Sequence, residues 1–242
     1  APPEPVDVGE EQAGIEGSEQ PQTDDGSIID VLVAYTPASR MAYGGQSGIE
    51  ALIDLAVLEA NQAYVNSQIN TQLRLVHMVE VSYTESGNMS TDLSRLRSTI
   101  DTFMDVVHGL RNTYKADMVN LIEESGQYCG MAYLMTTLSN SWASNAFSVV
   151  ASDCATGYYS FAHELGHNMG SAHDHANGSS GLFPYSFGYW APDSSFRTVM
   201  AYDCPTGCMR VPYFSNPNVW YNGFPTGIAY EVGSTIAADN AR

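Results

Sequence analysis

The segment that decides the fold is His163-Glu164-Leu165-Gly166-His167-Asn168-Met169-Gly170-Ser171-Ala172-His173-Asp174. A helix over residues 159–169 would place His163 and His167 on one face, where both imidazoles can reach the same ion. Gly170 can adopt the left-handed conformation that ends a helix, so that the chain can turn and bring His173 to that ion. Three imidazoles with an open fourth position are typical of a catalytic zinc site, whereas structural sites are closed and usually rich in cysteine. We therefore predict that these three histidines bind one Zn²⁺.

Two acidic residues accompany this motif. Glu164 directly follows the predicted ligand His163 on the helix. Its side chain therefore points away from the face that carries the two histidines and can contact a water bound to the metal. Asp174 is expected to support the site as a hydrogen-bond acceptor, and the alternative is a solvated carboxylate or a turn residue at the exit of the helix. A bare HExxH pattern also occurs in helices with surface histidines, but the fixed offsets of Gly170 and His173 argue against a purely structural origin.

The rest of the chain has an α/β order. Hydrophobic periodicity predicts strands over 28–35, 71–83, 117–122, 130–135 and 147–152, and helices over 46–66, 90–114, 159–169 and 233–242. The two last strands are separated by a polar loop, which permits an antiparallel hairpin. Such a hairpin would bring Cys129 near Cys154, which leaves Cys204 to pair with Cys208. Two disulfides fit an exported protein, and four reduced buried thiols are the alternative.

Composition excludes several classes of protein. The 242 residues include 27 acidic and 9 basic side chains, a net charge of -18, which rules out the basic surface that a nucleic-acid-binding protein needs. No apolar run approaches the ~20 residues that a membrane helix requires. Residues 1–26 are acidic and lack apolar periodicity, so we expect a mobile tail or the remnant of a pro-segment, and a secretion signal that was removed or never existed.

A second motif lies about 27 residues beyond His173, at Thr198-Val199-Met200-Ala201-Tyr202. It resembles the methionine turn of the metzincin zinc endopeptidases. Together with the histidine motif it makes the chain similar to that family, and His173-Asp174 is similar to the adamalysin or reprolysin branch. Residues 128–135, 154–160 and 213–217 look most like secreted bacterial peptidyl-Asp metallopeptidases. The resemblance covers about residues 27–242.

This resemblance implies a twisted five-stranded mixed sheet with one antiparallel edge strand, two long helices and an active-site helix. A cleft would separate an upper part, about 27–170, from an irregular lower part, about 171–242. The edge strand at 131–135 would bind an extended peptide through the main chain of Met131, Ala132 and Tyr133.

The same resemblance implies that Met200 packs beneath the zinc ligands. Tyr202 departs from the adamalysin pattern, because Met-x-Tyr is typical of the astacin and serralysin branches. Its hydroxyl therefore has three open roles: a zinc ligand, a donor to the oxyanion, or packing alone.

The specificity pocket of metzincins is walled by the chain that follows the methionine turn, here residues 203–213. Arg210 lies in this stretch and is expected to pair with a substrate carboxylate, which favours cleavage on the amino side of Asp and more weakly of Glu. Arg197 is the second candidate. In the opposing interpretation Arg210 is a surface residue that tethers the Cys204–Cys208 loop.

These observations predict a secreted, monomeric, zinc-dependent endopeptidase with protein or peptide substrates. Zinc lowers the pKa of its bound water towards ~7, and Glu164 would act as the general base. One alternative is an inactive binding module, against which the retained Glu164 argues. Another is a latent form in which residues 1–26 cover the cleft and Asp24 or Asp25 approaches the zinc. The sequence does not indicate whether Ca²⁺ binds.

Overall fold

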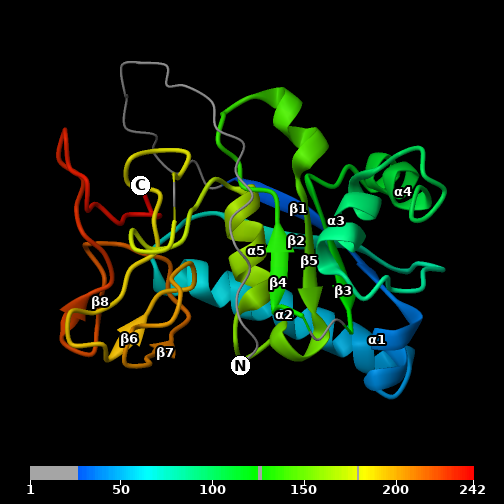
Figure 1. The fold of residues 1–242 in the computed structure, drawn as a ribbon, viewed down its shortest axis with the longest axis horizontal. Helices are drawn as coiled ribbons and strands as arrows, with labels where there is room; N and C mark the ends of the chain where they lie inside the picture. The colour runs from blue at the N-terminus through cyan, green and yellow to red at the C-terminus, as the bar shows by residue number, and fades with distance from the viewer. Residues whose placement is uncertain (1–26, 125–126, 179) are drawn as a thin grey trace.

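The computed structural model describes residues 27–124, 127–178 and 180–242, and a five-stranded mixed sheet forms its centre (Figure 1). The strand order is β2-β1-β3-β5-β4; β4 is antiparallel to β5 and the other pairs are parallel. The strands are β1 (Ile28–Tyr35), β2 (Gln72–Glu80), β3 (Met118–Glu123), β4 (Gly130–Ala132) and β5 (Phe147–Ala151). This confirms the predicted α/β class and the antiparallel edge strand.

Helices cover both faces of the sheet, because its central strands are apolar on both faces. Val31 and Val33 of β1 face a core that includes Ile53 and Leu165, whereas Leu32 faces a second core. The first core contains residues of α2 (Gln46–Asn66) and α5 (Ser160–Asn168), and the second contains residues of α3 (Met89–Arg97) and α4 (Val106–Tyr114). A short helix α1 (Pro37–Ala42) precedes α2. The continuous apolar run of β1 is therefore that of a parallel strand between two helical layers.

The predicted helix over 90–114 is wrong, since the structure divides it into α3 and α4. Between them the side chain of Asp101 accepts from the N–H of Phe103, and that of Asp105 accepts from the N–H of Thr102. Such local bonds from Asp side chains compete with helical hydrogen bonds and favour turns. The resemblance implied two long helices, and among the described residues α2 spans 21 residues and α5 spans 9.

The predicted C-terminal helix over 233–242 is also wrong. Ile228 and Ala238 exchange two backbone hydrogen bonds of 2.9 Å, so this segment pairs with the chain before it as an isolated bridge. Gly233 adopts a φ of 84°, a left-handed conformation that interrupts a helix. Ala237 and Ala238 are buried in this paired, non-helical conformation.

The residues after α5 form the irregular region that lies to one side of that helix, coloured yellow to red in Figure 1. It contains the two-residue strands β6 (Phe196–Arg197), β7 (Met209–Arg210), β8 (Trp220–Tyr221) and β9 (Phe224–Pro225). The residue after α2 attaches this region: the Ser67 hydroxyl oxygen accepts from the N–H of Phe214 at 2.7 Å, and its carbonyl accepts from Asn216 Nδ2 at 2.7 Å. No helix in the described part of the chain is long and apolar enough to cross a bilayer.

Candidate active site

Three imidazoles converge at the C-terminal half of α5. His163 and His167 lie one turn apart on the helix, and their Nε2 atoms are 3.1 Å apart. After the helix Gly170 has a φ of 93°, and this turn returns the chain so that His173 Nε2 lies 3.2 Å from His163 Nε2 and 3.0 Å from His167 Nε2. Tetrahedral ligands bound at the usual zinc–nitrogen distance would be separated by about 3.3 Å. The three nitrogens therefore have the spacing of ligands to one small ion.

Hydrogen bonds at the opposite ring nitrogens orient two of these imidazoles. His163 Nδ1 lies 2.7 Å from the Val199 carbonyl, and His167 Nδ1 lies 2.8 Å from the Ser171 carbonyl. A carbonyl can only accept, so each Nδ1 carries the proton and each Nε2 presents its lone pair to the centre. His173 Nδ1 is buried without a hydrogen-bond partner among the described residues.

Burial keeps the three imidazoles neutral. Desolvation is the largest cause that lowers the pKa of His163 well below its usual value, that of His167 to about 4 and that of His173 to about 2. Neighbouring histidines and the charge of Arg210 lower the pKa of His163 and His173 further. Neutral imidazole is the form that binds metals, so the donor set fits a divalent ion such as zinc at neutral pH.

Glu164 is buried between α5 and the edge strand. Its side chain is packed so closely on Gly130 that a β-carbon at that position would lie 2.6 Å from Glu164 Cγ and would overlap the carboxylate. Gly130 is the first residue of β4, where a glycine permits close approach of another group to the backbone. The sheet edge and the carboxylate next to the histidines are thus in direct contact.

The edge strand is shorter than the predicted 131–135 and ends at Ala132. Beyond it the backbone bonds to the active-site helix: Asn168 Nδ2 donates to the Tyr133 carbonyl at 2.8 Å, and the N–H of Met135 donates to the His167 carbonyl at 3.0 Å. Met131 and Ala132 pair with β5, and β4 lies at the sheet edge. The predicted substrate-binding residues therefore lie beside the histidines, attached to the helix that carries two of them.

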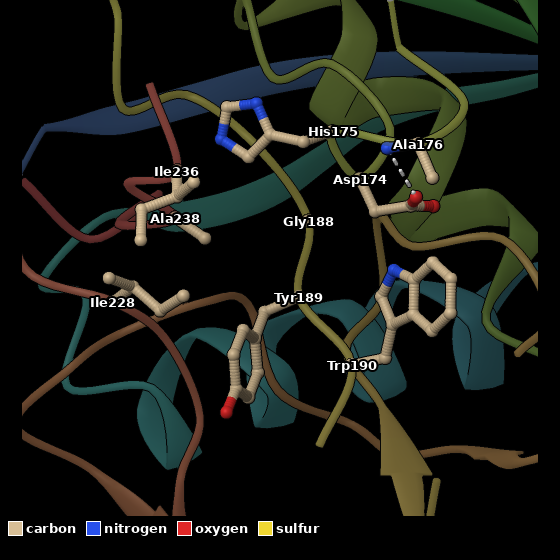
Figure 2. Close-up of a pocket in the computed structure, with 9 residues that line it drawn as sticks. All are labelled: Asp174, His175, Ala176, Gly188, Tyr189, Trp190, Ile228, Ile236 and Ala238. Atoms are coloured by element: carbon tan, nitrogen blue, oxygen red, sulfur yellow. Dashed lines mark hydrogen bonds between the residues drawn. The ribbon is translucent and has the colours of Figure 1, made fainter. Parts of the chain in front are cut away.

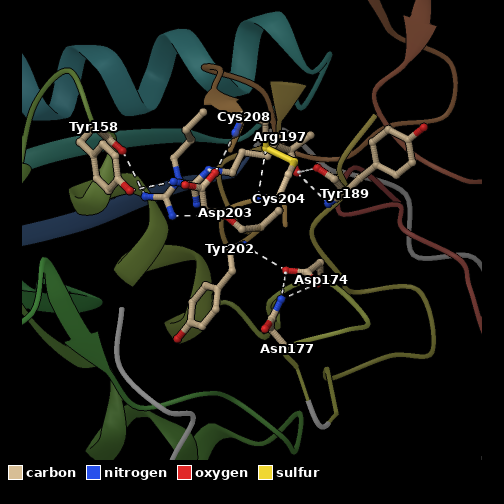
Figure 3. Close-up of polar contacts among 12 residues, drawn as sticks. Tyr158, Asp174, Asn177, Tyr189, Arg197, Tyr202, Asp203, Cys204 and Cys208 are labelled. Carbon is tan, nitrogen blue, oxygen red and sulfur yellow. Dashed lines mark hydrogen bonds and ion pairs between the residues drawn. A yellow bond between two sulfur atoms is a disulfide. The ribbon is translucent and has the colours of Figure 1, made fainter. Parts of the chain in front are cut away.

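The methionine of the second motif lies under the histidine site, and Met200 is completely buried with its thioether against Gly166 of α5. The ring of Tyr202 packs on the His173 ring with a centroid distance of 4.0 Å and an interplanar angle of 38°. Asp174 is also buried, and its carboxylate accepts from the N–H of Tyr202 at 3.0 Å and from the side chain of Asn177 (Figure 3). Asp174 is thus not solvated: it ties the segment of the third histidine to the methionine turn, and it also accepts from the N–H of Ala176 in its own turn.

The structure joins Cys129 to Cys154 and Cys204 to Cys208, the two pairs that the sequence predicts. The first disulfide connects the start of the edge strand to the loop before α5. The second closes a small loop directly after the methionine turn.

Arg210 and Arg197 are both buried, with 6% and 1% of their surface exposed. Arg210 is therefore not the surface residue of the opposing interpretation. Its positive charge contributes to the lowered pKa of all three histidines.

Sequence reasoning assigned no role to Gly130 or Tyr158. The Tyr158 carbonyl accepts from Arg210, and the Tyr158 hydroxyl accepts from Arg197 at 2.7 Å. A glycine at the head of a predicted strand was a signal for close approach, but the identity of the approaching group depends on tertiary contacts.

A cavity of about 280 Å³ lies below the segment that follows the third histidine (Figure 2). Its lining is mostly apolar, and Asp174 and His175 form part of its wall: Asp174, His175, Ala176, Gly188, Tyr189, Trp190, Ile228, Ile236 and Ala238. His175 Nε2 lies 2.7 Å from the Ala237 carbonyl, and its ring stacks on Phe187, so it holds the C-terminal segment in place.

Comparisons with known proteins agree with this geometry. Residues 26–231 match the family model described as metallo-peptidase family M12B, reprolysin-like. A peptidyl-Asp metalloendopeptidase of Stenotrophomonas maltophilia (strain R551-3) is 47% identical over 221 residues, 89% of this chain and 50% of the relative. One of Pseudomonas fragi is 38% identical over 185 residues, 74% of this chain and 99% of the relative. A solved structure described as a chaperone-substrate complex shares the fold, with a TM-score of 0.65 and 23% identity over 88% of this chain and 36% of that chain.

A mixed sheet with an antiparallel edge strand, next to a helix that carries two of three converging histidines, defines a metallopeptidase domain. The chain belongs to the reprolysin-like M12B family of metallopeptidases. It spans about half the length of the first curated relatives that it matches.

Proposed function

We propose that this protein is a zinc-dependent endopeptidase that hydrolyses peptide bonds in protein or peptide substrates. The observation that carries this proposal is the convergence of His163, His167 and His173, whose Nε2 atoms lie 3.0 to 3.2 Å apart. Zinc held by these nitrogens would supply Lewis acidity towards the scissile carbonyl and lower the pKa of water.

Glu164 is the general base of this reaction. It takes the proton of the attacking water and delivers it to the leaving amine, which a carboxylate can do at low cost when it is held in one orientation. Support comes from its position: it follows the first ligand on α5 and packs against Gly130 of the edge strand. A binding module without turnover would need the histidines but not this carboxylate.

The edge strand orients the substrate. An extended peptide adds to Met131 and Ala132 through main-chain hydrogen bonds, and Tyr133 lies at the point where the strand turns onto α5. Because Gly130 contacts Glu164, a peptide bound along this edge lies within reach of the general base.

Arg210 selects an acidic side chain at the position after the scissile bond, so that cleavage occurs on the amino side of Asp. Three observations support this proposal. Arg210 is buried, it follows the methionine turn, and its charge reaches all three histidines. The relatives are named peptidyl-Asp metalloendopeptidases. A guanidinium binds a carboxylate in a bidentate manner, which explains why an overall charge of -18 does not prevent recognition of an acidic side chain.

We also propose that the protein acts outside the cell as a monomer. Disulfides persist in oxidising compartments, and the two in this chain brace the edge strand and the loop after the methionine turn. Asp24 and Asp25, the predicted metal-blocking residues of a latent form, lie outside the described residues.

Two substitutions test the proposed function. Glu164→Gln should lower kcat by at least about a hundredfold and leave about one zinc per chain, because general acid–base catalysis contributes ~10²–10⁴-fold. His173→Ala should lose both zinc and activity, whereas His175→Ala should keep zinc, because His175 bonds to Ala237 away from the site. Zinc content by elemental analysis and hydrolysis of an unfolded protein give the readouts. Near-normal activity of Glu164→Gln, or full zinc in His173→Ala, would contradict the assignment.

A further inference from the structure

A buried arginine cluster surrounds the Ala201 carbonyl of the methionine turn. We define this cluster as Arg197, Arg210 and Tyr158. Arg197 donates from one terminal nitrogen to the Ala201 carbonyl at 2.7 Å. Its other terminal nitrogen donates to the Tyr158 hydroxyl at 2.7 Å (Figure 3). Its Nε lies 3.9 Å from a carboxylate oxygen of Asp203, whose side chain is 62% exposed. Arg197 is thus held on both sides of its guanidinium.

Arg210 is held by the same two residues. One terminal nitrogen donates to the Tyr158 carbonyl at 3.2 Å and the other to the Ala201 carbonyl at 3.3 Å. Its guanidinium carbon lies 4.7 Å from the centre of the Tyr158 ring, and that of Arg197 lies 5.5 Å from the same ring. Both arginines therefore share the Ala201 carbonyl and the Tyr158 ring, and a shift of either shared group moves the other guanidinium.

We propose that Arg197 and Tyr158 are positioning residues that hold Arg210 at a fixed depth, and that this fixed depth makes the pocket discriminate Asp from Glu. This proposal rests on the proposed function, in which Arg210 binds the substrate carboxylate. Asp and Glu carry the same charge and differ by one methylene group. A mobile cation would follow either carboxylate, whereas a fixed one matches a single side-chain length.

The charges of the cluster favour this role over a purely structural one. Two carbonyls and a hydroxyl can be bridged by neutral amide side chains without the desolvation cost of buried guanidinium groups. Two cations gathered around one carbonyl also repel each other. Their combined field attracts an anion, and Arg197, which is more deeply buried than Arg210, adds to that field.

The test compares three peptides that differ only in the residue after the scissile bond: Asp, Glu or Ala. For Arg197→Met we expect the ratio of kcat/KM for Asp over Glu to fall about tenfold, and kcat/KM for the Ala peptide to stay within about twofold. Arg197→Lys should restore the ratio only in part, because an ammonium group lacks the planar fork that reaches both acceptors. Tyr158→Phe keeps the ring and removes one acceptor, so its ratio should fall less than that of Arg197→Met.

The matched control is Arg111→Met. Arg111 also donates to backbone carbonyls, at 3.1 Å for Ala116 and 2.7 Å for Ala143, and its guanidinium lies 5.0 Å from the ring of Phe147. It belongs to α4, on the far face of the sheet, so this variant should leave all three peptides unchanged. Zinc content and the thermal unfolding midpoint of every variant show whether it folds. If Arg197→Met does not fold, Tyr158→Phe tests the proposal in its place.

The remaining outcomes would each contradict one part of the proposal. An equal loss on all three peptides, or an unchanged Asp:Glu ratio in Arg197→Met and Tyr158→Phe, would show that the cluster is structural and would leave the peptidase assignment intact. A wild-type enzyme without preference for Asp would instead refute the role of Arg210. If Arg210→Met kept the preference and Arg197→Met lost it, Arg197 would be the residue that touches the substrate.

Discussion

The thioether of Met200 occupies the space that a side chain at position 166 would fill. A β-carbon built on Gly166 would overlap the Met200 sulfur and lie 3.2 Å from its Cε and 3.3 Å from a ring carbon of Phe214. Gly166 lies on the active-site helix between Glu164 and His167, so the methionine turn packs directly under the residues of the site. The carbonyl of Val199, next to Met200, also accepts from His163 Nδ1. One turn thus supports the helix by packing and orients the first histidine by a hydrogen bond.

We expect Gly166→Ala to destabilise the protein by about 1–3 kcal/mol, the usual cost of overpacking a dense core. Met200→Ala should cost about 2–5 kcal/mol through the cavity that it leaves. The double variant should be less destabilised than the sum, because each substitution relieves the defect of the other. Equilibrium unfolding in urea measures the three values. Gly109→Ala in α4 is the control, since nothing lies within 4 Å of its β-carbon; purely additive costs would show that Gly166 and Met200 are not coupled.

Gly130→Ala should lower kcat by about a hundredfold and leave the zinc content unchanged. The new methyl group would displace the Glu164 side chain, and a misplacement of about 1 Å in a catalytic group can cost ~10²-fold in rate. The three atoms nearest to the new methyl group all belong to Glu164, so the histidines should bind metal as before. Steady-state kinetics and elemental analysis check both statements. Wild-type kcat in this variant would mean that the carboxylate has room that the structure does not provide.

The metal-free protein should lose stability as the pH falls from about 6.5 to about 4. Unfolded histidines titrate near 6.5, whereas burial lowers the pKa of His167 to about 4 and that of His173 to about 2 in the folded state. In this window the unfolded state binds protons that the folded state does not, so protons favour unfolding by up to about tenfold per pH unit for each histidine. Urea unfolding with a chelator at several pH values measures this dependence. His173→Asn should reduce the slope by about one proton, and an unchanged slope would contradict the buried neutral state.

Tyr202→Phe should keep zinc and stability, because the ring contact with His173 remains. We expect kcat to fall at least about tenfold, since the hydroxyl of a ring packed on His173 can donate to the oxygen on which charge develops. Kinetics with one unfolded protein as the substrate provide the measurement. A normal kcat would leave packing as the role of Tyr202, and loss of zinc would make its hydroxyl a ligand.

The histidine motif could be read from the sequence because its geometry is local. His163 and His167 are one helical turn apart, and Gly170 provides the turn that brings back His173. The disulfide between Cys129 and Cys154 was also predictable, because it closes a hairpin of neighbouring strands. Local periodicity failed at 90–114, where side chains of Asp101 and Asp105 compete for the backbone.

The histidine cluster and the α/β order could be predicted from the chain alone, because helix and strand periods and short turns act within about ten residues of the chain. Which groups surround the histidines and Glu164 depends on the tertiary structure. Arg210 meets Tyr158 across 52 residues, and the Val199 carbonyl meets His163 across 36. Gly130 meets Glu164 only because β4 lies at the sheet edge next to α5. Such contacts depend on how closely packed layers fit together, and spacing along the chain carries no signal of that fit.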